Sequence, residues 1–430
     1  MGMSIFPEGK SFPTGNVNQF SHIIYYYRII MYNNKMARRR SFVKRTNKKK
    51  TRRNRTRTKN RTKNRTKRIS QKGGGVKIVA TLAEYRSFVL SVAFHPRLPL
   101  LATGSDDNTV KLWRLSFDRS SPPLSVVTLE GHTDSVRSVA FHPTAPLLAT
   151  GSGDQTVKLW SFSDDWFFPP ERLDPKSKPH PPTLVATLAG RHIDWVNSVA
   201  FHPTLLLLAS GSEDNTVKLW LLSPDNSSAT LLATLAGHGS SVNSVAFHPT
   251  APLLATGSTD MTVRLWLLSS DNSSATCVAT LAGHSRWVNS VAFHPTAPLL
   301  ASGSSDSTVK LWLLSSDYSS ATNVATLRGH SNLVLSVAFH PTAPLLATGS
   351  NDRTVRLWLL SDDYSSASVI ETMVGHGGAV ESVAFHPTAP LLATGSDDRT
   401  VILWNYDEPS PAPEPTPSCP LNASSRSGPS

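Results

Sequence analysis

Three residue types that often perform catalysis recur together along this chain of 430 residues. Seven tryptophans mark the repeats: an Asp lies six residues before each Trp, a Ser or Thr ten residues before it, and in six copies a His 28 residues before it. Two of the copies are His132, Thr150, Asp154 and Trp160, and His238, Thr256, Asp260 and Trp266. Asp, His and a hydroxyl are the members of a hydrolytic triad, but a nucleophile is needed once rather than seven times. We therefore expect no catalysis by these residues, and no enzyme.

A buried hydrogen-bond network accounts better for the same four positions. An indole N–H can only donate, a hydroxyl and a neutral imidazole can each donate and accept, and a carboxylate accepts. An unpaired buried polar group costs roughly 1–3 kcal/mol, so such a set must close on itself. A chain of bonds from Trp to Ser or Thr, to His and to Asp pairs every member. In the first copy Tyr85 takes the place of the His.

A second set of histidines, one in each His-Pro dipeptide, raises the question of a metal site. They are His95, His142, His202, His248, His294, His340 and His386. With one such His per repeat, they lie too far apart to share an ion, and we interpret them as turn residues. The chain also shows no glycine-rich phosphate loop, paired-Cys motif or HExxH helix. We expect no metal and no cofactor.

The spacing of the tryptophans indicates which elements position these residues. The tryptophans are Trp113, Trp160, Trp220, Trp266, Trp312, Trp358 and Trp404, and the last five are spaced by 46 residues. A period of roughly 40–45 residues, with short apolar runs and Gly, Ser and Asp turns, is typical of β-propeller blades. In the fourth copy we expect strands over 230–235, 241–247, 252–258 and 262–268. An extra strand over 76–82 is predicted to complete the seventh blade, because no outer strand follows Trp404.

With its Gly-His dipeptides, Asp turns and Trp strands, the segment 76–406 resembles the WD40 repeat family. The resemblance implies an all-β fold, a seven-bladed β-propeller of four-stranded antiparallel blades. It also implies a docking role for the face that carries the Gly-His and Asp turns. One family feature is absent, because the Asp that normally follows the Trp is replaced in every copy. The residues found there are Arg114, Ser161, Leu221, Leu267, Leu313, Leu359 and Asn405.

Three positions on that face vary between copies while their neighbours stay constant, 25, 23 and 5 residues before each Trp. We interpret these as positions that the fold does not dictate. Because large aromatic residues and Arg often anchor interfaces, we predict a partner site there and on its neighbours. The predicted residues are Phe88, Trp195, Arg286, Trp287, Leu333, Arg353 and Arg399. An alternative stays open, in which some of these aromatics pack beneath neighbouring loops.

The connection over 161–182 is 14 residues longer than in the 46-residue copies, and it contains Trp166 and Phe167. Long loops in compact repeats are often functional. We predict a second peptide contact at Trp166 and Phe167, with a loop folded onto its own blade as the alternative.

The segments outside the repeats differ strongly from them in charge. Residues 1–75 hold 22 of the 43 Lys and Arg and one acidic residue, Glu8, which leaves 21 basic and 29 acidic residues in the remainder. We expect an N-terminal extension over 1–35, a disordered basic tail over 36–75 and a disordered Pro/Ser-rich tail over 407–430. Two start sites stay open: Met1, and Met36, which is followed by Ala-Arg-Arg-Arg at the beginning of the basic tail.

Between Met36 and Lys72 there are 19 Lys and Arg and no Asp or Glu. This density favours binding of nucleic acid or another polyanion through counterion release, nuclear import, or both. The residues that we single out are Arg38, Arg39, Arg40, Lys48, Lys49, Lys50, Arg52 and Arg53. The apolar run 23–30 is too short to span a bilayer and contains Arg28, so we expect no membrane partner.

Two cysteines cannot form a disulfide framework, which favours an intracellular location. Within the cell, nuclear, nucleolar and cytoplasmic locations stay open, and the basic tail favours the nucleus. We expect a monomeric ring that docks proteins or peptides without catalysis and is tethered by its basic tail. Three alternatives stay open: a ubiquitin-ligase substrate receptor, a nucleic-acid packaging or ribosome-biogenesis factor acting mainly through the tail, and a recently duplicated array with little selected binding.

Overall fold

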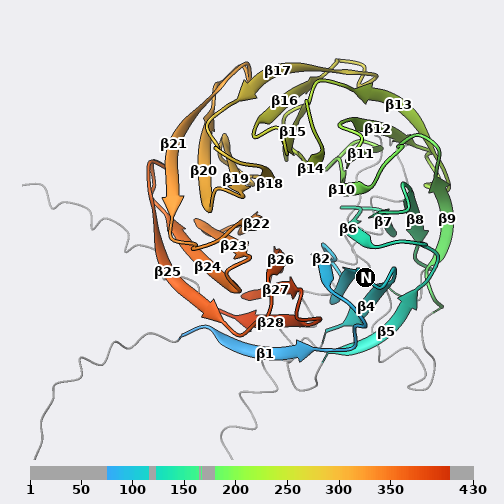
Figure 1. Cartoon of the computed structure of the whole chain (residues 1–430). Helices are drawn as coiled ribbons and strands as arrows, with labels where there is room; N and C mark the ends of the chain where they lie inside the picture. The colour runs from blue at the N-terminus through green and yellow to red at the C-terminus, as the bar shows by residue number, and fades with distance from the viewer. Residues whose placement is uncertain (1–74, 116–122, 164–165, 167–179, 407–430) are drawn as a thin grey trace, which may run out of the picture. The chain divides into compact units, whose positions relative to one another are not determined.

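The computed structural model describes residues 75–115, 123–163, 166 and 180–406. The predicted extension, nearly all of the basic tail and the Pro/Ser-rich tail therefore lie outside the described residues. Within them, 28 strands form seven four-stranded sheets. Figure 1 shows the sheets arranged as blades around a central axis, as the repeat period predicts.

Each blade runs outward from an inner strand to an outer strand. The inner strands are β2 (Val89–Phe94), β6 (Val136–Phe141), β10 (Val196–Phe201), β14 (Val242–Phe247), β18 (Val288–Phe293), β22 (Val334–Phe339) and β26 (Val380–Phe385). The second strands are β3 (Leu100–Ser105), β7 (Leu147–Ser152), β11 (Leu207–Ser212), β15 (Leu253–Ser258), β19 (Leu299–Ser304), β23 (Leu345–Ser350) and β27 (Leu391–Ser396). The expected bounds in the fourth copy differ from these by one residue.

The Trp strands are β4 (Val110–Arg114), β8 (Val157–Ser161), β12 (Val217–Leu222), β16 (Val263–Leu268), β20 (Thr308–Leu314), β24 (Thr354–Leu360) and β28 (Val401–Asn405). The outer strands of blades one to six are β5 (Leu124–Leu129), β9 (Thr183–Leu188), β13 (Ala229–Leu235), β17 (Ala275–Leu281), β21 (Ala321–Arg328) and β25 (Ala367–Val374). Neighbouring strands within each blade are antiparallel, and the order in blade one is β2-β3-β4-β5.

The seventh blade joins the two ends of the repeat array. Its order is β26-β27-β28-β1, so the first strand of the chain, β1 (Lys77–Leu82), is its outer strand. β1 runs antiparallel to β28, with Lys77 opposite Asn405 and Leu82 opposite Val401. The predicted closure by the N-terminal strand is therefore present, with the strand beginning one residue later than expected.

A serine on each inner strand also links neighbouring blades, which the sequence analysis did not foresee. The Ser91 Oγ accepts a hydrogen bond of 3.1 Å from the Val139 backbone N–H in the next blade. The same bond recurs six more times at 3.0–3.1 Å, including Val92 N–H to Ser382 Oγ, which joins blade one to blade seven. The inner strands are thus tied to one another around the whole ring.

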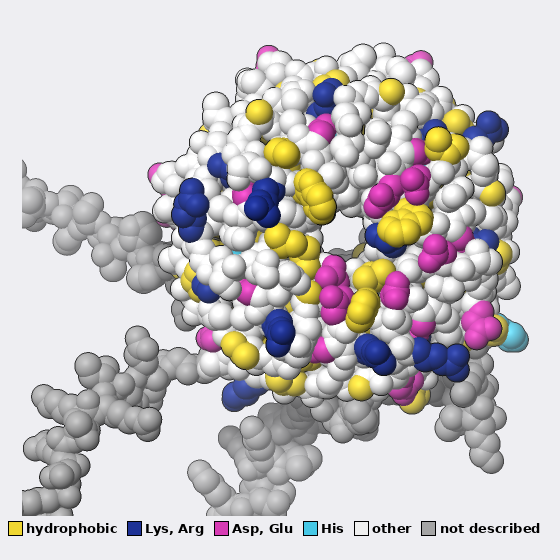
Figure 2. Space-filling view, in the orientation of Figure 1, with side chains coloured by type: hydrophobic (Ala, Val, Ile, Leu, Met, Phe, Trp, Pro, Cys, Tyr) yellow, Lys and Arg dark blue, Asp and Glu magenta, His cyan; other side chains and the backbone are white. Residues whose placement is uncertain are grey.

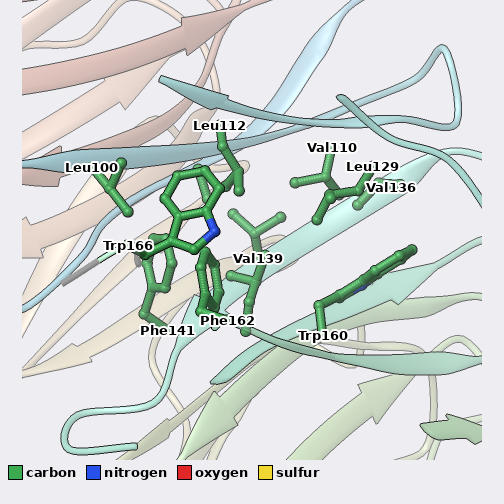
Figure 3. Packing of buried hydrophobic residues seen from close by; sticks show 12 residues of the cluster. Leu100, Val110, Leu112, Leu129, Val136, Val139, Phe141, Trp160, Phe162 and Trp166 are labelled. Carbon is green, nitrogen blue, oxygen red and sulfur yellow. The ribbon is translucent and has the colours of Figure 1, made fainter. Parts of the chain in front are cut away.

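The apolar core lies between blades rather than inside one. Figure 3 shows the cluster between blades one and two, where Leu100, Val110 and Leu112 face Val136 and Val139. The blades approach closely because a glycine lies on the second strand: a Cβ at Gly104 would come within 2.8 Å of the Val136 carbonyl oxygen. The described part of the chain contains no helix long and apolar enough to cross a membrane.

Candidate protein-docking face

The four recurring polar residues form one connected chain of hydrogen bonds in six blades. In blade two the Trp160 Nε1–H donates to Thr150 Oγ1 at 3.0 Å, His132 Nε2 lies 2.7 Å from the same oxygen, and His132 Nδ1 lies 2.7 Å from Asp154 Oδ2. The distances in blade four are 2.9, 2.7 and 2.8 Å for Trp266, Thr256, His238 and Asp260. The hydroxyl is fully buried, so no free nucleophile is offered.

Blade one builds the same connection with a phenol. The Trp113 Nε1–H donates to Tyr85 Oη at 2.8 Å, and Tyr85 Oη–H donates to Thr103 Oγ1 at 2.8 Å. Burial raises the pKa of Tyr85 far above its usual value. The phenol therefore stays neutral and keeps the proton that it donates.

The charge states in the network follow from burial and hydrogen bonding. Burial alone would raise the pKa of Asp260, but hydrogen bonds from Thr262 and His238 outweigh it and lower that pKa to about 2. Burial lowers the pKa of His238, so the imidazole is neutral at pH 7. The carboxylate then accepts from His238 Nδ1–H, and Nε2 accepts from the Thr256 hydroxyl.

The network holds the loops of one face in place. Asp260 Oδ2 also accepts from the Gly239 backbone N–H at 3.0 Å, and Oδ1 accepts from the Thr262 hydroxyl at 2.6 Å. One carboxylate therefore connects the loop before the inner strand to the turn before the Trp strand. Because both loops belong to the predicted docking face, that face is rigid at its base.

Two further constant positions belong to this arrangement and were missed. Thr262 lies four residues before its Trp, and Ser258, eight residues before, accepts from the Asp260 backbone N–H at 3.0 Å. A Thr and a Ser occupy these two positions in all seven copies. Their constancy is the signal that could have identified them.

The position five residues before each Trp requires a correction. All seven residues there have φ between 67° and 71°, in the left-handed region that L-residues other than Asn and Asp rarely adopt. They are Asn108, Gln155, Asn215, Met261, Ser307, Arg353 and Arg399. The expectation that the fold does not dictate this position was wrong for the backbone, because the tight turn between the second and third strands imposes the conformation. Only the side chains are free to vary.

The predicted aromatic anchors lie at the surface rather than beneath loops. Phe88 is 41% exposed, Trp195 39% and Trp287 53%. Arg286, Arg353 and Arg399 are also exposed, whereas Leu333 is half-buried. Figure 2 shows apolar and acidic side chains gathered around the opening at the centre of this face.

The position 23 residues before each Trp divides the ring into two parts. Asn197, Asn243 and Asn289 donate through Nδ2 to the backbone carbonyls of Val242, Val288 and Val334 in the next blade, at 3.2, 3.0 and 2.9 Å. We call these three bonds the asparagine staples. The same position holds Leu335 in blade six, Glu381 in blade seven, Leu90 in blade one and Arg137 in blade two. At these four junctions no such bond forms between the described residues.

Arg137 supports one of the exposed aromatics. Its guanidinium carbon lies 4.0 Å from the centroid of the Trp195 ring, and its Nη1–H donates to Asn197 Oδ1 at 3.4 Å. A cation over an indole face is attracted by the ring quadrupole. Trp195 is therefore exposed on one side and held in a defined orientation on the other.

The family model described as WD domain, G-beta repeat matches the chain over seven segments: 76–114, 124–161, 182–220, 229–266, 275–312, 321–358 and 367–405. The chain belongs to the WD40 repeat family.

Two human striatins are similar to part of this WD40 protein. It is 30% identical over 154 residues to human striatin-4, which is 36% of this chain and 20% of striatin-4. It is 31% identical over 140 residues to human striatin-3, which is 33% of this chain and 17% of striatin-3. The chain thus spans about a fifth of the length of these curated relatives.

The prediction of a second contact at Trp166 was wrong for this residue. The Trp166 side chain is 4% exposed, packs edge-on against Phe162 at 5.5 Å between ring centroids, and donates from Nε1 to the His180 carbonyl at 2.7 Å. It fills the cluster between blades one and two (Figure 3). The long loop thereby places the Trp166 indole between two blades, because burying a large apolar side chain away from water is favourable. Phe167 lies outside the described residues.

The His-Pro histidines lie in the turns between inner and second strands. His142 Nδ1 accepts from the backbone N–H groups of Thr144 and Ala145, at 3.1 and 2.8 Å. Burial lowers the pKa of His142 to about 4, so the ring is neutral and its Nδ1 lone pair stays available. In the part of the chain that the structure describes, no three His, Cys, Asp or Glu side chains come together as a metal site would require.

Proposed function

We propose that this WD40 protein is a non-catalytic scaffold that docks partner proteins or peptides on the ring face bearing the Gly-His and Asp turns. One observation carries the proposal: large aromatic side chains are exposed around the central opening, on loops whose bases are fixed by the buried network. The exposed Trp195 precedes the inner strand of blade three, and the exposed Trp287 precedes that of blade five. Rigid, exposed aromatics anchor interfaces at low entropic cost.

The basic tail supplies the second half of the proposal. With 19 Lys and Arg between residues 36 and 72, the tail binds nucleic acid or another polyanion by counterion release. Such binding is independent of base sequence and weakens steeply as salt rises. The same residues favour a nuclear compartment.

The docking surface is tested by affinity purification of the full chain beside a Trp195→Ala/Trp287→Ala variant. Protein partners should be lost from the variant while the ring still melts cooperatively. Leu124→Ala, which removes an exposed side chain on an outer strand, is the control and should retain the partners. Retention of every partner by the double Trp variant would instead favour an array with little selected binding.

The tail is tested separately by comparing the full chain with a chain starting at Lys72, with nuclease treatment and a salt titration. Salt-sensitive nucleic acid should be present only with the full chain, and protein partners should be present with both. Loss of all partners with the tail would make the tail the main effector and the ring a passenger. Co-purifying ligase subunits would favour the substrate-receptor alternative.

A further inference from the structure

One part of the docking face carries an excess of carboxylates. Glu381 and Asp397 belong to blade seven, Asp106 to blade one and Asp134 to blade two, and we call these four residues the acidic sector. The positions that correspond to Asp397 in blades four, five and six are Thr259, Ser305 and Asn351. Blade two has Gly153 at this position and blade three has Glu213, so its acidic residues lie in blades seven, one and three and are absent from blades four to six. This uneven distribution does not follow from the fold, which repeats in every blade.

The acidic sector is also where the asparagine staples are missing. In blades three, four and five the staple asparagine is bonded to the neighbouring blade, and its side chain is unavailable to a ligand. In blades seven, one and two the same position holds Glu381, Leu90 and Arg137. The inner strands of blades three to five are thus bonded to the next blade through an asparagine, whereas blade seven carries a carboxylate at that position.

Two of the carboxylates have no partner among the described residues. Neither Glu381 nor Asp397 accepts a side-chain hydrogen bond there, and no Lys or Arg forms an ion pair with any residue of the acidic sector in the described part of the ring. Asp106 accepts only from the neutral hydroxyls of Ser87 and Ser135. A carboxylate that is recessed and unpaired is costly for the free protein, and a bound cation removes that cost.

The electrostatics agree with this geometry. Burial, followed by the nearby charge of Asp397, raises the pKa of Glu381 to about 7, although Arg137 opposes the shift. Burial and the charge of Asp106 likewise raise the pKa of Asp397. Arg137, the cation that opposes this shift, is directed to Trp195 and Asn197 and is not paired with these two carboxylates.

One exposed aromatic lies within the acidic sector and another lies beside it. The Phe88 carbonyl accepts from the Asp106 backbone N–H at 2.9 Å, so this 41% exposed ring belongs to the loop next to Asp106. Trp195 lies beyond Arg137. Apolar rings beside unpaired carboxylates fit a protein segment that carries both apolar and positively charged side chains.

We propose that the acidic sector binds a basic segment of a partner protein, which places a Lys or Arg among Glu381, Asp397 and Asp106 and an apolar side chain against Phe88. The proposal rests on the docking function proposed above and specifies the class of partner. Charge complementarity selects this occupant over an acidic or neutral segment, because an acidic one would meet like charges on Asp397, Asp106 and Asp134, and on Glu381 in its ionised form.

The test selects binders for the full chain from a displayed library of random 12-residue peptides at about 0.15 M salt. Enriched peptides are then synthesised, and their affinities are measured by fluorescence polarisation. The decisive variant is Glu381→Gln/Asp397→Asn, which removes two carboxyl groups but breaks no hydrogen bond of the described residues. Glu371→Gln, on the outer strand β25, is the control for loss of a carboxylate elsewhere. Trp287→Ala tests blade five, outside the acidic sector, on the same face.

We expect enriched peptides to carry Lys or Arg beside apolar residues and to bind the double variant at least tenfold more weakly. Their affinity should fall between 50 and 300 mM salt and be unchanged by Glu371→Gln. Enriched peptides that lack positive charge, or that ignore the double variant, would overturn the inference. If such peptides bind more weakly to the Trp287→Ala variant, that result still supports the proposed docking function. A selection that enriches no peptide also overturns the inference, whereas the docking function is decided by partner retention in the double Trp variant.

Discussion

The stapled blades and the acidic sector are built from nearly the same repeat and differ at a few side chains. In blade four Asn243 is bonded to the Val288 carbonyl of the next blade and to Thr259. In blade seven Glu381 occupies the same position without such a bond and with a pKa raised to about 7. The difference teaches that the ring does not need a staple at every junction, since the serine bonds and apolar clusters are present at all seven. Positions released from cohesion are therefore available for binding.

The largest expected effect comes from breaking the buried network in a stapled blade. Thr256→Val keeps the shape of the side chain but leaves Trp266 Nε1–H and His238 Nε2 without a partner. Two unpaired buried groups cost about 2–4 kcal/mol of unfolding free energy, measured by denaturant titration.

The matched change in blade one is Thr103→Val. There Trp113 keeps its 2.8 Å bond to Tyr85, so the expected loss is about half as large. Equal losses for Thr256→Val and Thr103→Val would show that the phenol does not substitute for the imidazole in the way that the geometry indicates.

Glu381→Gln is expected to raise stability at pH 8. A carboxyl whose pKa is raised in the folded state favours folding below its ordinary pKa of 4.5, and this contribution is lost as pH rises to about 7. The amide does not ionise, so the gain of the variant should be about 1–3 kcal/mol at pH 8 and vanish below pH 4.5. Thermal melting across this pH range measures it.

The reverse behaviour would contradict this view of the acidic sector. A variant that is less stable than the parent at pH 8 would mean that Glu381 is paired and stabilising. Glu371→Gln, which changes a carboxylate on the outer strand β25, should leave the pH profile unchanged.

A smaller effect is expected from removing one staple. Asn243→Leu places in blade four the residue type that blades one and six already carry, and it loses the 3.0 Å bond to the Val288 carbonyl. The expected cost is about 1 kcal/mol in unfolding free energy. Leu335→Asn is the reciprocal change, and it should stabilise the protein because the new amide can donate to the Val380 carbonyl of the next blade. An equal loss of stability for both variants would mean that contact between blades depends on local packing and not on the staple.

The smallest effect concerns the left-handed turn position. Met261→Asn and Arg353→Asn introduce a residue that tolerates φ near 70°, as Asn108 and Asn215 already do. Each should stabilise the ring by about 0.5 kcal/mol. For Arg353→Asn we expect this gain together with weaker partner binding, which would show that the Arg is retained for contact; unchanged binding would remove Arg353 from the predicted site.

Much of the fold follows from the repeat alone. The tryptophan period predicts seven blades, and the missing last strand predicts that β1 completes the seventh. The network could be predicted because its donors and acceptors are complementary, and only a continuous series of hydrogen bonds pairs all of them. In blade two its members are Trp160, Thr150, His132 and Asp154. The repeat period and the hydrogen-bonding groups within each repeat therefore determined the structure of a blade.

The tertiary structure decided what lies between blades and what reaches the surface. The hydrogen bond from Val92 to Ser382 spans 290 residues, and the acidic sector forms across the same junction. No local sequence pattern therefore predicts the bond or the acidic sector. Trp166 is buried because a neighbouring cluster receives it, while Trp195 and Trp287 stay exposed although their residue type is the same. Composition and period fix how each repeat folds, but exposure and charge proximity depend on which distant residues the closed ring places side by side.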